Sequence, residues 1–284
     1  MPARLYLILA LALFSVSTTS LVIRYLAAVP AIVMAFWRMF TASGMLWGYS
    51  ALQPAGRLSN KNRIPIILAG LFLGGHFACF FAGVRLTTIA NATLLGNVAP
   101  VFTALLERLN GQAWNRTTIL GLILSLAGAV IIQAGGLTNP ENAAGNWLAL
   151  LSSLFMALAW IQAKTIRKNT HTVVYSRHLF LIASGTILVI VFLAGYSPFD
   201  FERQHLPWFL FLGLVPSILG HNLLNYAVRF ISSTAVASVV LGEPILASFF
   251  GFILFQEAMP PASLIGGPMI LVGLYYILSN QFPD

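Results

Sequence analysis

The chain has 284 residues, of which 58% are hydrophobic and only 8% are charged, and its formal net charge is +8 at pH 7. A water-soluble domain carries roughly a quarter charged residues, so this composition excludes an ordinary soluble enzyme or binding domain. The lysines and arginines are scattered among short polar breaks instead of gathered in one stretch. The positive charge therefore does not predict nucleic-acid binding, and we expect no nucleic-acid partner.

Apolar runs of about 20 residues, the length that crosses a hydrocarbon core of about 30 Å, follow one another along the chain. The first run begins just after Arg4 and is longer than the core of a signal peptide, so we interpret it as a membrane helix. The pattern predicts an all-α integral membrane protein with ten transmembrane helices. Their expected ranges are 5–23, 31–51, 64–84, 87–106, 117–135, 145–164, 172–194, 207–228, 233–255 and 262–279.

The basic residues of the predicted loops fall unevenly on the two sides of the membrane. If the N-terminus is cytoplasmic, most of them are cytoplasmic too, as the positive-inside rule requires. The cytoplasmic set is then Arg4, Arg57, Lys61, Arg63, Arg108, Arg116, Lys164, Arg167, Lys168 and Arg229, and the outer set is Arg24, Arg85 and Arg203. We therefore expect a multi-pass protein of the bacterial inner (plasma) membrane with both termini in the cytoplasm.

The sequence also repeats itself. The matching pairs are residues 83–100 with 227–244, Gly121 with Gly266, Gly128 with Gly273, Gln112 with Glu257, and Arg38 with Arg177. Five helices in each copy, an odd number, make the second copy enter the membrane from the opposite side. Such inverted five-helix repeats are typical of secondary transporters. We predict that the first repeat covers residues 1–138 and the second, of inverted topology, covers residues 139–284.

Several features in this order resemble one family. They are the five-plus-five helices, Phe36-Trp37-Arg38 in the second helix, the prolines Pro100 and Pro244 inside the fourth and ninth, and the run Leu241-Gly242-Glu243-Pro244 followed by Phe255-Gln256-Glu257. Over essentially its whole length the chain resembles the drug/metabolite transporter superfamily, EamA branch, and it looks most like the YddG-type exporters of aromatic and other amino acids.

The resemblance implies a secondary or facilitative transporter that exports amino acids and related metabolites by alternating access. We expect a small-molecule substrate and the lipid bilayer as partners, a functional monomer and no cofactor. The first repeat departs from the second, because Val98-Ala99-Pro100 stands where the second has Gly242-Glu243-Pro244. A matched pair of buried acids is therefore missing, and we expect transport without an obligatory proton.

Polar side chains inside a membrane helix are costly, so each one needs a partner or a water-filled cavity. Glu243 is either a site for a substrate amine or a proton, or a structural carboxyl beside Pro244. His76 lies near the bilayer midplane and either lines a cavity or makes a structural hydrogen bond. Trp160 is either an interfacial anchor or a stacking surface for an apolar substrate. The expected substrate-binding residues are His76, Asn97, Trp160, His221 and Glu243.

A second group of residues is expected to act in gating or structure. Arg38 and Arg177 lie a few residues inside opposite membrane faces, where an arginine can reach headgroups or cap helix carbonyls. Pro100 and Pro244 interrupt their helices. The amide of Asn97, three residues before Pro100, is placed to bond backbone groups that this interruption exposes.

Motifs for other kinds of chemistry are missing from the sequence. It contains no G-x-x-x-x-G-K-[ST] phosphate loop, no H-E-x-x-H or cysteine–histidine cluster, no paired aspartates within helices and no G-x-S-x-G elbow. We therefore expect neither catalytic residues nor a metal site. The alternative is an intramembrane enzyme acting on lipid headgroups, which needs a reactive group of residues at one membrane face. A structural or receptor-like subunit is a third interpretation, which the inverted repeat disfavours.

Overall fold

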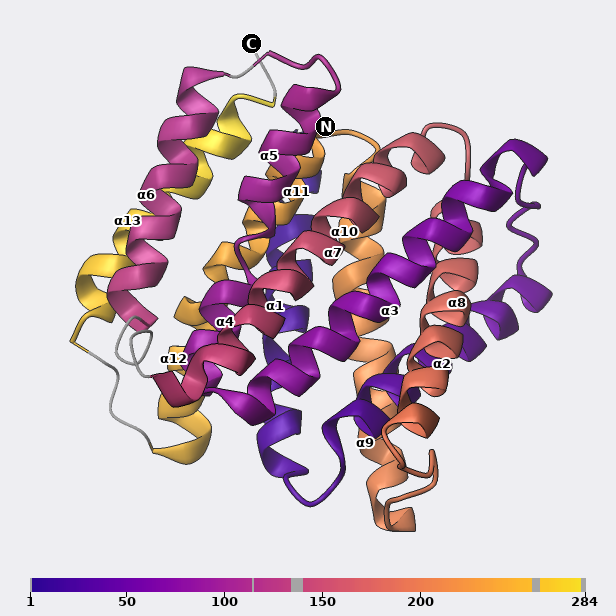
Figure 1. The fold of residues 1–284 in the computed structure, drawn as a ribbon. Coiled ribbons are helices and arrows are strands. Elements are labelled where there is room, and N and C mark those ends of the chain that lie inside the picture. The colour runs from indigo at the N-terminus through magenta and orange to yellow at the C-terminus, as the bar shows by residue number, and fades with distance from the viewer. Residues whose placement is uncertain (1, 114, 134–139, 257–260, 282–284) are drawn as a thin grey trace.

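The computed structural model describes residues 2–113, 115–133, 140–256 and 261–281, and the regular structure in them is helical (Figure 1). The α-helices are α1 (Pro2–Tyr25), α2 (Ala31–Leu52), α3 (Arg63–Leu86), α4 (Ile89–Gly96), α5 (Ala99–Leu109), α6 (Arg116–Gln133), α7 (Ala143–Arg167), α8 (Thr172–Leu193), α9 (Leu206–Leu212), α10 (Asn222–Ala227), α11 (Ser233–Val239), α12 (Glu243–Phe255) and α13 (Ser263–Ser279). Shorter turns are the 3₁₀ helices η1 (Asn60–Asn62), η2 (Pro140–Asn142), η3 (Arg203–His205) and η5 (Val240–Gly242), and the π-helix η4 (Gly213–His221).

Three of the membrane segments consist of more than one helix. The α4–α5 pair, the α9–η4–α10 series and the α11–η5–α12 series each run through one predicted span. With α1, α2, α3, α6, α7, α8 and α13, they make ten segments in the described residues. The ten-helix prediction is confirmed, although three of the helices are interrupted.

Hydropathy and exposure both fit a lipid surrounding. Five stretches are long and apolar enough to cross a membrane by themselves: Ala3–Ile23, Asn60–Leu86, Pro140–Arg167, Thr172–Leu193 and Arg203–Ala227. Three shorter apolar helices, Arg116–Ile132, Ser233–Leu246 and Ser263–Ser279, accompany them. Large apolar side chains such as Leu7, Leu193 and Leu264 are exposed on the outer surface, where hydrocarbon chains would solvate them.

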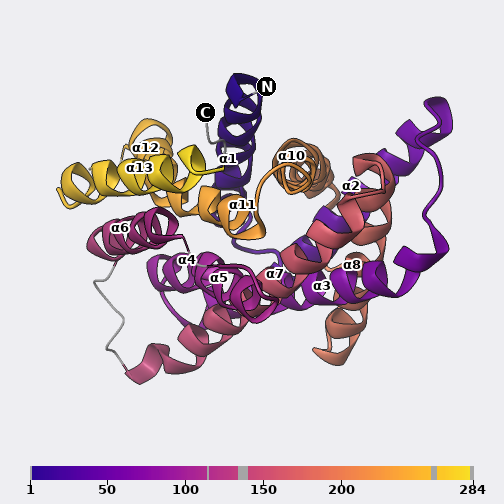
Figure 2. The ribbon, with the colours of Figure 1, turned by 90° about the horizontal axis from the view of Figure 1, so that it is seen from above.

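The chain crosses the molecule back and forth. The beginning of α1 and the end of α13 lie at the same end of the bundle, together with the turn between α7 and α8, whereas the turn between α8 and α9 lies at the opposite end (Figure 1). Seen from above, α6 and α13 form one edge of the molecule, and α2 and α8 lie toward the other (Figure 2).

The packing of the helices follows a two-fold pattern. In the predicted repeats, α1, α2, α3, α4–α5 and α6 correspond in order to α7, α8, α9–η4–α10, α11–η5–α12 and α13. The contact of α3 with α7 is mirrored by that of α1 with η4 and α10, and the contact of α3 with α8 by that of α2 with η4 and α9. Corresponding segments also pack directly on each other: α2 on α8, α6 on α13, and α4–α5 on α11–η5–α12 through α5 and α11. This pattern is expected of inverted repeats related by a two-fold axis.

The glycines that match between the repeats meet where α6 crosses α13. A Cβ atom added to Gly121 would lie 2.6 Å from the carbonyl oxygen of Gly273, and one added to Gly128 would lie 2.5 Å from that of Gly266. The first glycine of each helix therefore faces the second glycine of the other, as a two-fold axis between antiparallel helices requires. Only glycine lets the two backbones approach this closely.

We expect Gly266→Ala to lower the thermal unfolding midpoint of the purified protein, whereas Gly267→Ala should not lower it. A Cβ at position 266 would lie 2.6 Å from Cγ1 of Ile132, whereas one at position 267 meets nothing within 4 Å. Overpacking of this kind costs about 1–3 kcal/mol. The two neighbours share a helix, so the difference between their midpoints isolates the contact with α6. Equal midpoints would contradict the close crossing.

The segment α9–η4–α10 contains a π-helical stretch with Pro216 inside it. Proline has no N–H to donate to the carbonyl of Leu212, four residues earlier. That carbonyl instead accepts a hydrogen bond from the Ser217 hydroxyl over 2.9 Å. π-Helical segments are frequently found at functional sites, and this one packs against α1 and α2.

Some sequence predictions fall outside the described residues. They concern the boundary between the repeats at 138–139 and Glu257, which the sequence pairs with Gln112. Both stay predictions.

Candidate functional site

Two interrupted helices, one from each repeat, meet inside the bundle. Helix α4 ends at Gly96 and α5 begins at Ala99, and η5 separates α11 from α12, which begins at Glu243. Pro100 and Pro244 occupy the second positions of α5 and α12. Proline is accommodated in a first helical turn, but it cannot continue the hydrogen-bond ladder from the preceding turn. The same residue type at corresponding positions therefore accompanies both breaks.

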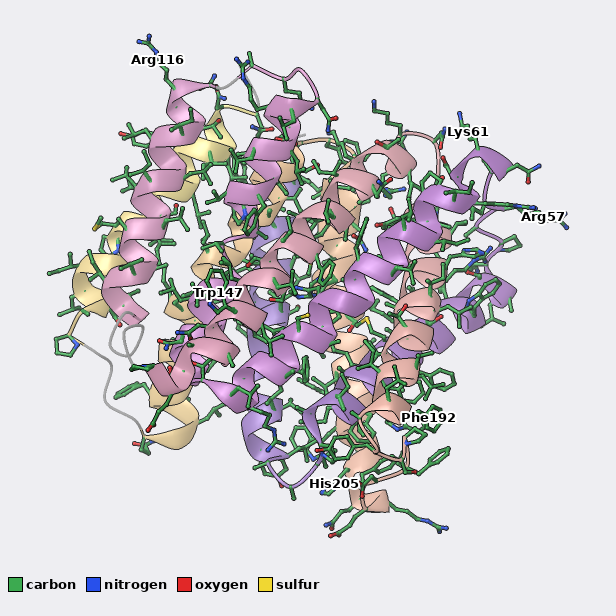
Figure 3. All side chains as sticks on the ribbon, in the orientation of Figure 1. Arg57, Lys61, Arg116, Trp147, Phe192 and His205 are labelled. Carbon is green, nitrogen blue, oxygen red and sulfur yellow. The ribbon has the colours of Figure 1, made fainter. Side chains whose placement is uncertain are left out.

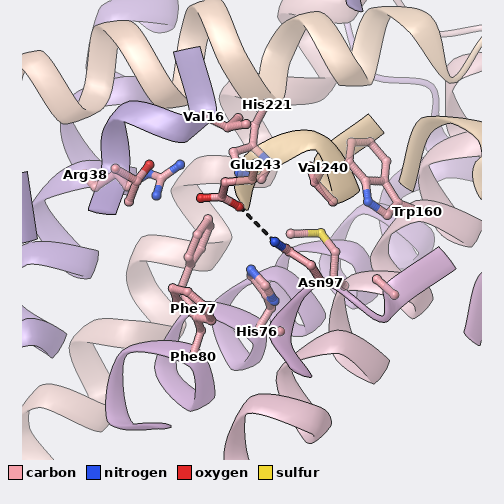
Figure 4. Close-up of a pocket in the computed structure, with 14 residues that line it drawn as sticks. Val16, Arg38, His76, Phe77, Phe80, Asn97, Trp160, His221, Val240 and Glu243 are labelled. Carbon is pink, nitrogen blue, oxygen red and sulfur yellow. Dashed lines mark hydrogen bonds between the residues drawn. The ribbon is translucent and has the colours of Figure 1, made fainter. Parts of the chain in front are cut away.

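A hydrogen bond joins the two breaks. The side-chain amide of Asn97 donates from Nδ2 to Oε2 of Glu243 over 3.0 Å (Figure 4). Asn97 follows the last turn of α4, and Glu243 is the first residue of α12, where the helix dipole favours a negative charge. The expectation that the Asn97 amide bonds exposed backbone is therefore wrong. It bonds a carboxylate of the other repeat.

This bond lies beside a cavity of about 60 Å³. By this measure one water molecule needs roughly 10–15 Å³, so the cavity has room for a few of them. The side chains that line it are Val16, Thr19, Arg38, His76, Phe77, Phe80, Gly96, Asn97, Ala99, Met156, Trp160, His221, Val240 and Glu243. The structure thus places all five residues expected to bind substrate around one space, to which both repeats contribute.

Arg38 also lines this cavity, from α2 (Figure 4). Its Nε donates to the Ser217 hydroxyl over 3.0 Å, and Nη2 donates to the carbonyl of Pro216 over 3.5 Å. Its guanidinium carbon lies 4.6 Å from the centre of the Phe77 ring. Only 2% of Arg38 is exposed, so this arginine does not reach lipid headgroups. It braces the π-helical stretch and faces the cavity.

Two histidines contribute ring nitrogens to the site. Nδ1 of His76 lies 2.9 Å from the carbonyl oxygen of Ser152 on α7. Because a carbonyl only accepts, Nδ1 carries the hydrogen, and Nε2 of the neutral ring is left as an acceptor. The ring of His76 stacks on Phe80, with centroids 6.0 Å apart, and the ring of His221 meets Phe77 at 5.6 Å in an edge-on contact.

The remaining wall of the cavity is apolar. Trp160 on α7 is 4% exposed and lies with Met156 and two phenylalanines, Phe77 and Phe80, around the space. This burial excludes the alternative that Trp160 is an interfacial anchor. Flat aromatic surfaces of this kind suit apolar or aromatic groups, so the site combines charged groups with an aromatic wall.

The other residues assigned to gating or structure lie elsewhere. Arg177 on α8 donates from Nη2 to the carbonyl of Gly56 over 3.2 Å, and its guanidinium carbon lies 4.2 Å from the Trp47 ring centre. Pro100 and Pro244 shape the breaks without lining the cavity. The two arginines that the repeat pairs therefore have different surroundings.

Glu107 is a buried acid that the sequence did not predict. Glu107 lies one residue beyond the predicted fourth span, but α5 continues to Leu109 and buries it to 8% exposure. Its Oε1 accepts from the backbone N–H of Ser233 over 2.7 Å, and its Oε2 accepts from the Thr234 hydroxyl over 2.6 Å. The carboxylate of one repeat thus caps α11 of the other, at the end of the bundle that holds the chain termini.

The turn before α11 is held by two further side chains. Lys164 on α7 donates to the carbonyl of Ile231 over 2.6 Å, and the Gln281 side chain accepts from the backbone N–H of Ser232 over 2.9 Å. Within the described residues, no group of three His, Cys, Asp or Glu side chains is placed to hold a metal ion.

The chain matches a known protein family. The model of the EamA-like transporter family matches residues 3–134 and again residues 143–279. The chain belongs to the EamA-like transporter family. The two matches cover the first and second halves of the chain and confirm the family resemblance that the sequence indicated.

Individual relatives align with most of the chain. The chain is 27% identical to an uncharacterised transporter of Archaeoglobus fulgidus, with 87% of this chain and 88% of that one aligned. It is 25% identical to the pseudopaline exporter CntI of Pseudomonas aeruginosa, with 94% and 93% aligned, and 26% identical to the transporter YdfC of Bacillus subtilis, with 86% and 80% aligned. A solved crystal structure superposes with a TM-score of 0.82 over 97% of this chain at 17% identity, which shows the fold.

Membership of the EamA family decides between the interpretations that the sequence left open. The protein is a multi-pass membrane transporter for small molecules, and not an enzyme acting on lipid headgroups or a purely structural subunit. The cavity between the two helix breaks is therefore a candidate for the substrate site of a transporter.

Proposed function

We propose that this transporter exports amino acids, aromatic and other, and related metabolites across the inner membrane by alternating access. The observation that carries the proposal is the cavity at the junction of the repeats, where Asn97 of one helix break bonds Glu243 of the other. Broken helices at a repeat interface are where secondary transporters bind their cargo. The pseudopaline exporter among the relatives supports export as the direction.

The residues around the cavity suit an amphiphilic cargo. Glu243 and Arg38 offer one charge of each sign, and Trp160 offers an aromatic surface. The space in this conformation is water-sized, so a metabolite enters as the two repeats move apart. α5 packs on α11, and the hydrogen bonds of Glu107 reinforce this contact; we infer that it closes the end of the bundle that holds the termini. Cargo then leaves by the opposite end.

The test is transport by the purified protein in sealed liposomes. Labelled phenylalanine and alanine should move down their gradients, chemically unchanged and without ATP. Trp160→Ala should slow phenylalanine about tenfold and alanine much less, because stacking on the ring serves only the aromatic substrate. Leu264→Ala, which removes an exposed side chain on the outer surface, is the control. Absence of flux for every amino acid through the unaltered protein would overturn the proposal.

We also propose that both termini are cytoplasmic and that the monomer is functional. Lys61 and Arg116 project from the end of the bundle that holds the termini, and Arg57 projects sideways from the neighbouring turn between α2 and α3 (Figure 3). The positive-inside rule expects such basic residues at a cytoplasmic face. The monomer proposal rests on both repeats of a single chain contributing residues to the cavity.

An engineered cysteine tests the orientation. We expect Asn60→Cys, in a Cys79→Ser background, to react with a membrane-impermeant maleimide in inside-out vesicles and to stay unlabelled in intact cells. Residue 60 is exposed in the turn between α2 and α3, on the side that carries the basic residues. A cysteine at Phe199, which is exposed at the opposite end, is the reciprocal control. Labelling of residue 60 from outside the cell would reverse the orientation.

A further inference from the structure

Arg38 keeps part of its hydrogen-bonding capacity unused. Nε and Nη2 donate to Ser217 and Pro216 on the π-helical stretch. In the described part of the chain, Nη1 has no hydrogen-bond partner, although Arg38 is almost fully buried and lines the cavity. The two bonds and the Phe77 ring fix the plane of the guanidinium. A preorganised arginine of this kind is suited to bind an anionic group.

Thr19 also lines this cavity and has an unpaired hydroxyl. Its side chain is 7% exposed, and its Oγ1 has no hydrogen-bond partner among the described residues. A buried hydroxyl without a partner costs free energy. The neighbouring Thr18 hydroxyl, in contrast, donates to the carbonyl of Ser15 over 2.7 Å and does not line the cavity. Thr19, with its unpaired hydroxyl, therefore lines the same cavity as Arg38.

The carboxyl group of Glu243, opposite Arg38, restricts which anionic ligands the cavity can bind. Glu243 lies close enough to attract Arg38 electrostatically, and the two side chains point toward each other across the cavity (Figure 4). No nitrogen–oxygen pair between them is within the 4.0 Å of an ion pair. A doubly charged phosphate would be repelled by this carboxylate. A ligand with one carboxylate and one ammonium group can pair the carboxylate with Arg38 and the ammonium group with Glu243.

We propose that Arg38 and Thr19 form a carboxylate-binding subsite, which restricts the cargo to molecules with a carboxylate and makes zwitterions the preferred class. The guanidinium donates from Nη1 and the threonine from Oγ1 to the two carboxylate oxygens. The ammonium group lies toward Glu243, and an apolar side chain lies against Phe80 and Trp160. The subsite rests on the proposed function, because it concerns the same cavity.

Ligand binding in detergent tests the subsite separately from transport. The probes are L-phenylalanine and L-phenylalaninamide, which differ only in the carboxylate, and affinity is measured from quenching of tryptophan fluorescence. Unaltered protein should bind the amide at least 10-fold more weakly, since charge-assisted hydrogen bonds are the strong ones. Thr19→Val should weaken phenylalanine about 3- to 10-fold and leave the amide unchanged. Thr18→Val, which leaves the cavity intact, should change neither.

Arg38→Gln should weaken phenylalanine by a larger factor, again without an effect on the amide. The Arg38→Gln variant also loses its hydrogen bonds to Pro216 and Ser217, which complicates its interpretation. Thr19→Val is therefore the deciding variant, because the Thr19 hydroxyl bonds none of the described residues. Equal affinity of the unaltered protein for the two probes, or equal losses for both in Thr19→Val, would overturn the subsite. Failure of the proposed function has a different signature, because no amino acid would then cross the liposome membrane at all.

Discussion

Glu243→Ala is expected to lower amino-acid flux in liposomes at least tenfold at matched protein levels. The substitution removes the acceptor of the Asn97 amide, the one side-chain bond shown between the two helix breaks, and also the negative pole that faces Arg38. A hydrogen bond to a charged group contributes about 1.5–3 kcal/mol, which corresponds to roughly a tenfold to hundredfold change in an equilibrium.

Glu243→Gln separates the hydrogen bond from the charge. The glutamine carbonyl still accepts from Asn97, so this variant should transport at a rate between that of unaltered protein and that of Glu243→Ala. If Glu243→Gln is as slow as Glu243→Ala, the charge is what matters. Rates equal to the unaltered protein in both variants would show that Glu243 is only a packing residue beside Pro244.

The same variants decide the coupling to protons. We expect an imposed pH gradient to leave the steady accumulation of substrate unchanged, because Ala99 stands where a symmetric proton site would need a second acid. Counterflow with and without the gradient measures this directly. Uphill transport that follows the pH gradient and disappears in Glu243→Gln would make Glu243 the coupling site and contradict the expectation.

Glu107→Ala is expected to open the end of the bundle that holds the termini. Without the carboxylate, the N–H of Ser233 and the hydroxyl of Thr234 lose their partner, and only the Ser232 hydroxyl still caps α11. Two hydrogen bonds to a charged acceptor contribute about 1.5–3 kcal/mol each. The population with α11 displaced should therefore rise tenfold or more.

Cysteine labelling from the side of the termini measures this opening. Ala99→Cys, which lines the cavity and is 1% exposed, should react about tenfold faster with an impermeant maleimide in Glu107→Ala than in unaltered protein, in a Cys79→Ser background. Glu107→Gln keeps one acceptor and should give an intermediate rate. A lower unfolding midpoint with no faster labelling would mean that Glu107 stabilises the fold without closing that end.

The number and order of the membrane helices were predictable, since long apolar runs leave few alternatives in a hydrocarbon solvent. The breaks were partly predictable, since Pro100 and Pro244 stand out in the sequence. That Asn97 bonds Glu243 was not, because the partner is 146 residues away. Sequence distance cannot show which of several polar groups an inverted packing brings together.

Some of the residues around the cavity could be predicted from the sequence, and others could not. His76, Trp160 and His221 are recognisable because polar or amphipathic side chains within apolar runs need a reason to be there. Thr19 and Phe77 carry no such signal, since threonine and phenylalanine are ordinary in membrane helices. Glu107 was missed because the fourth helix was ended three residues too early, which placed a buried carboxylate in a loop.

The cap on α11 exists on one side of the repeat only. At the offset of 144 residues, Ser233 corresponds to Ile89 at the start of α4, but Glu107 corresponds to Gly251, which has no carboxylate to offer. In a perfectly symmetric duplication, the conformations open to the two membrane faces would have equal free energies. Here the hydrogen bonds of Glu107 make these free energies unequal. Such a bias cannot choose the direction of net movement, which the concentrations on the two sides decide. It instead gives the carrier different half-saturation concentrations at its two faces. At the face that is closed in the more stable conformation, the apparent affinity for cargo is lower because only a small fraction of the molecules is open there.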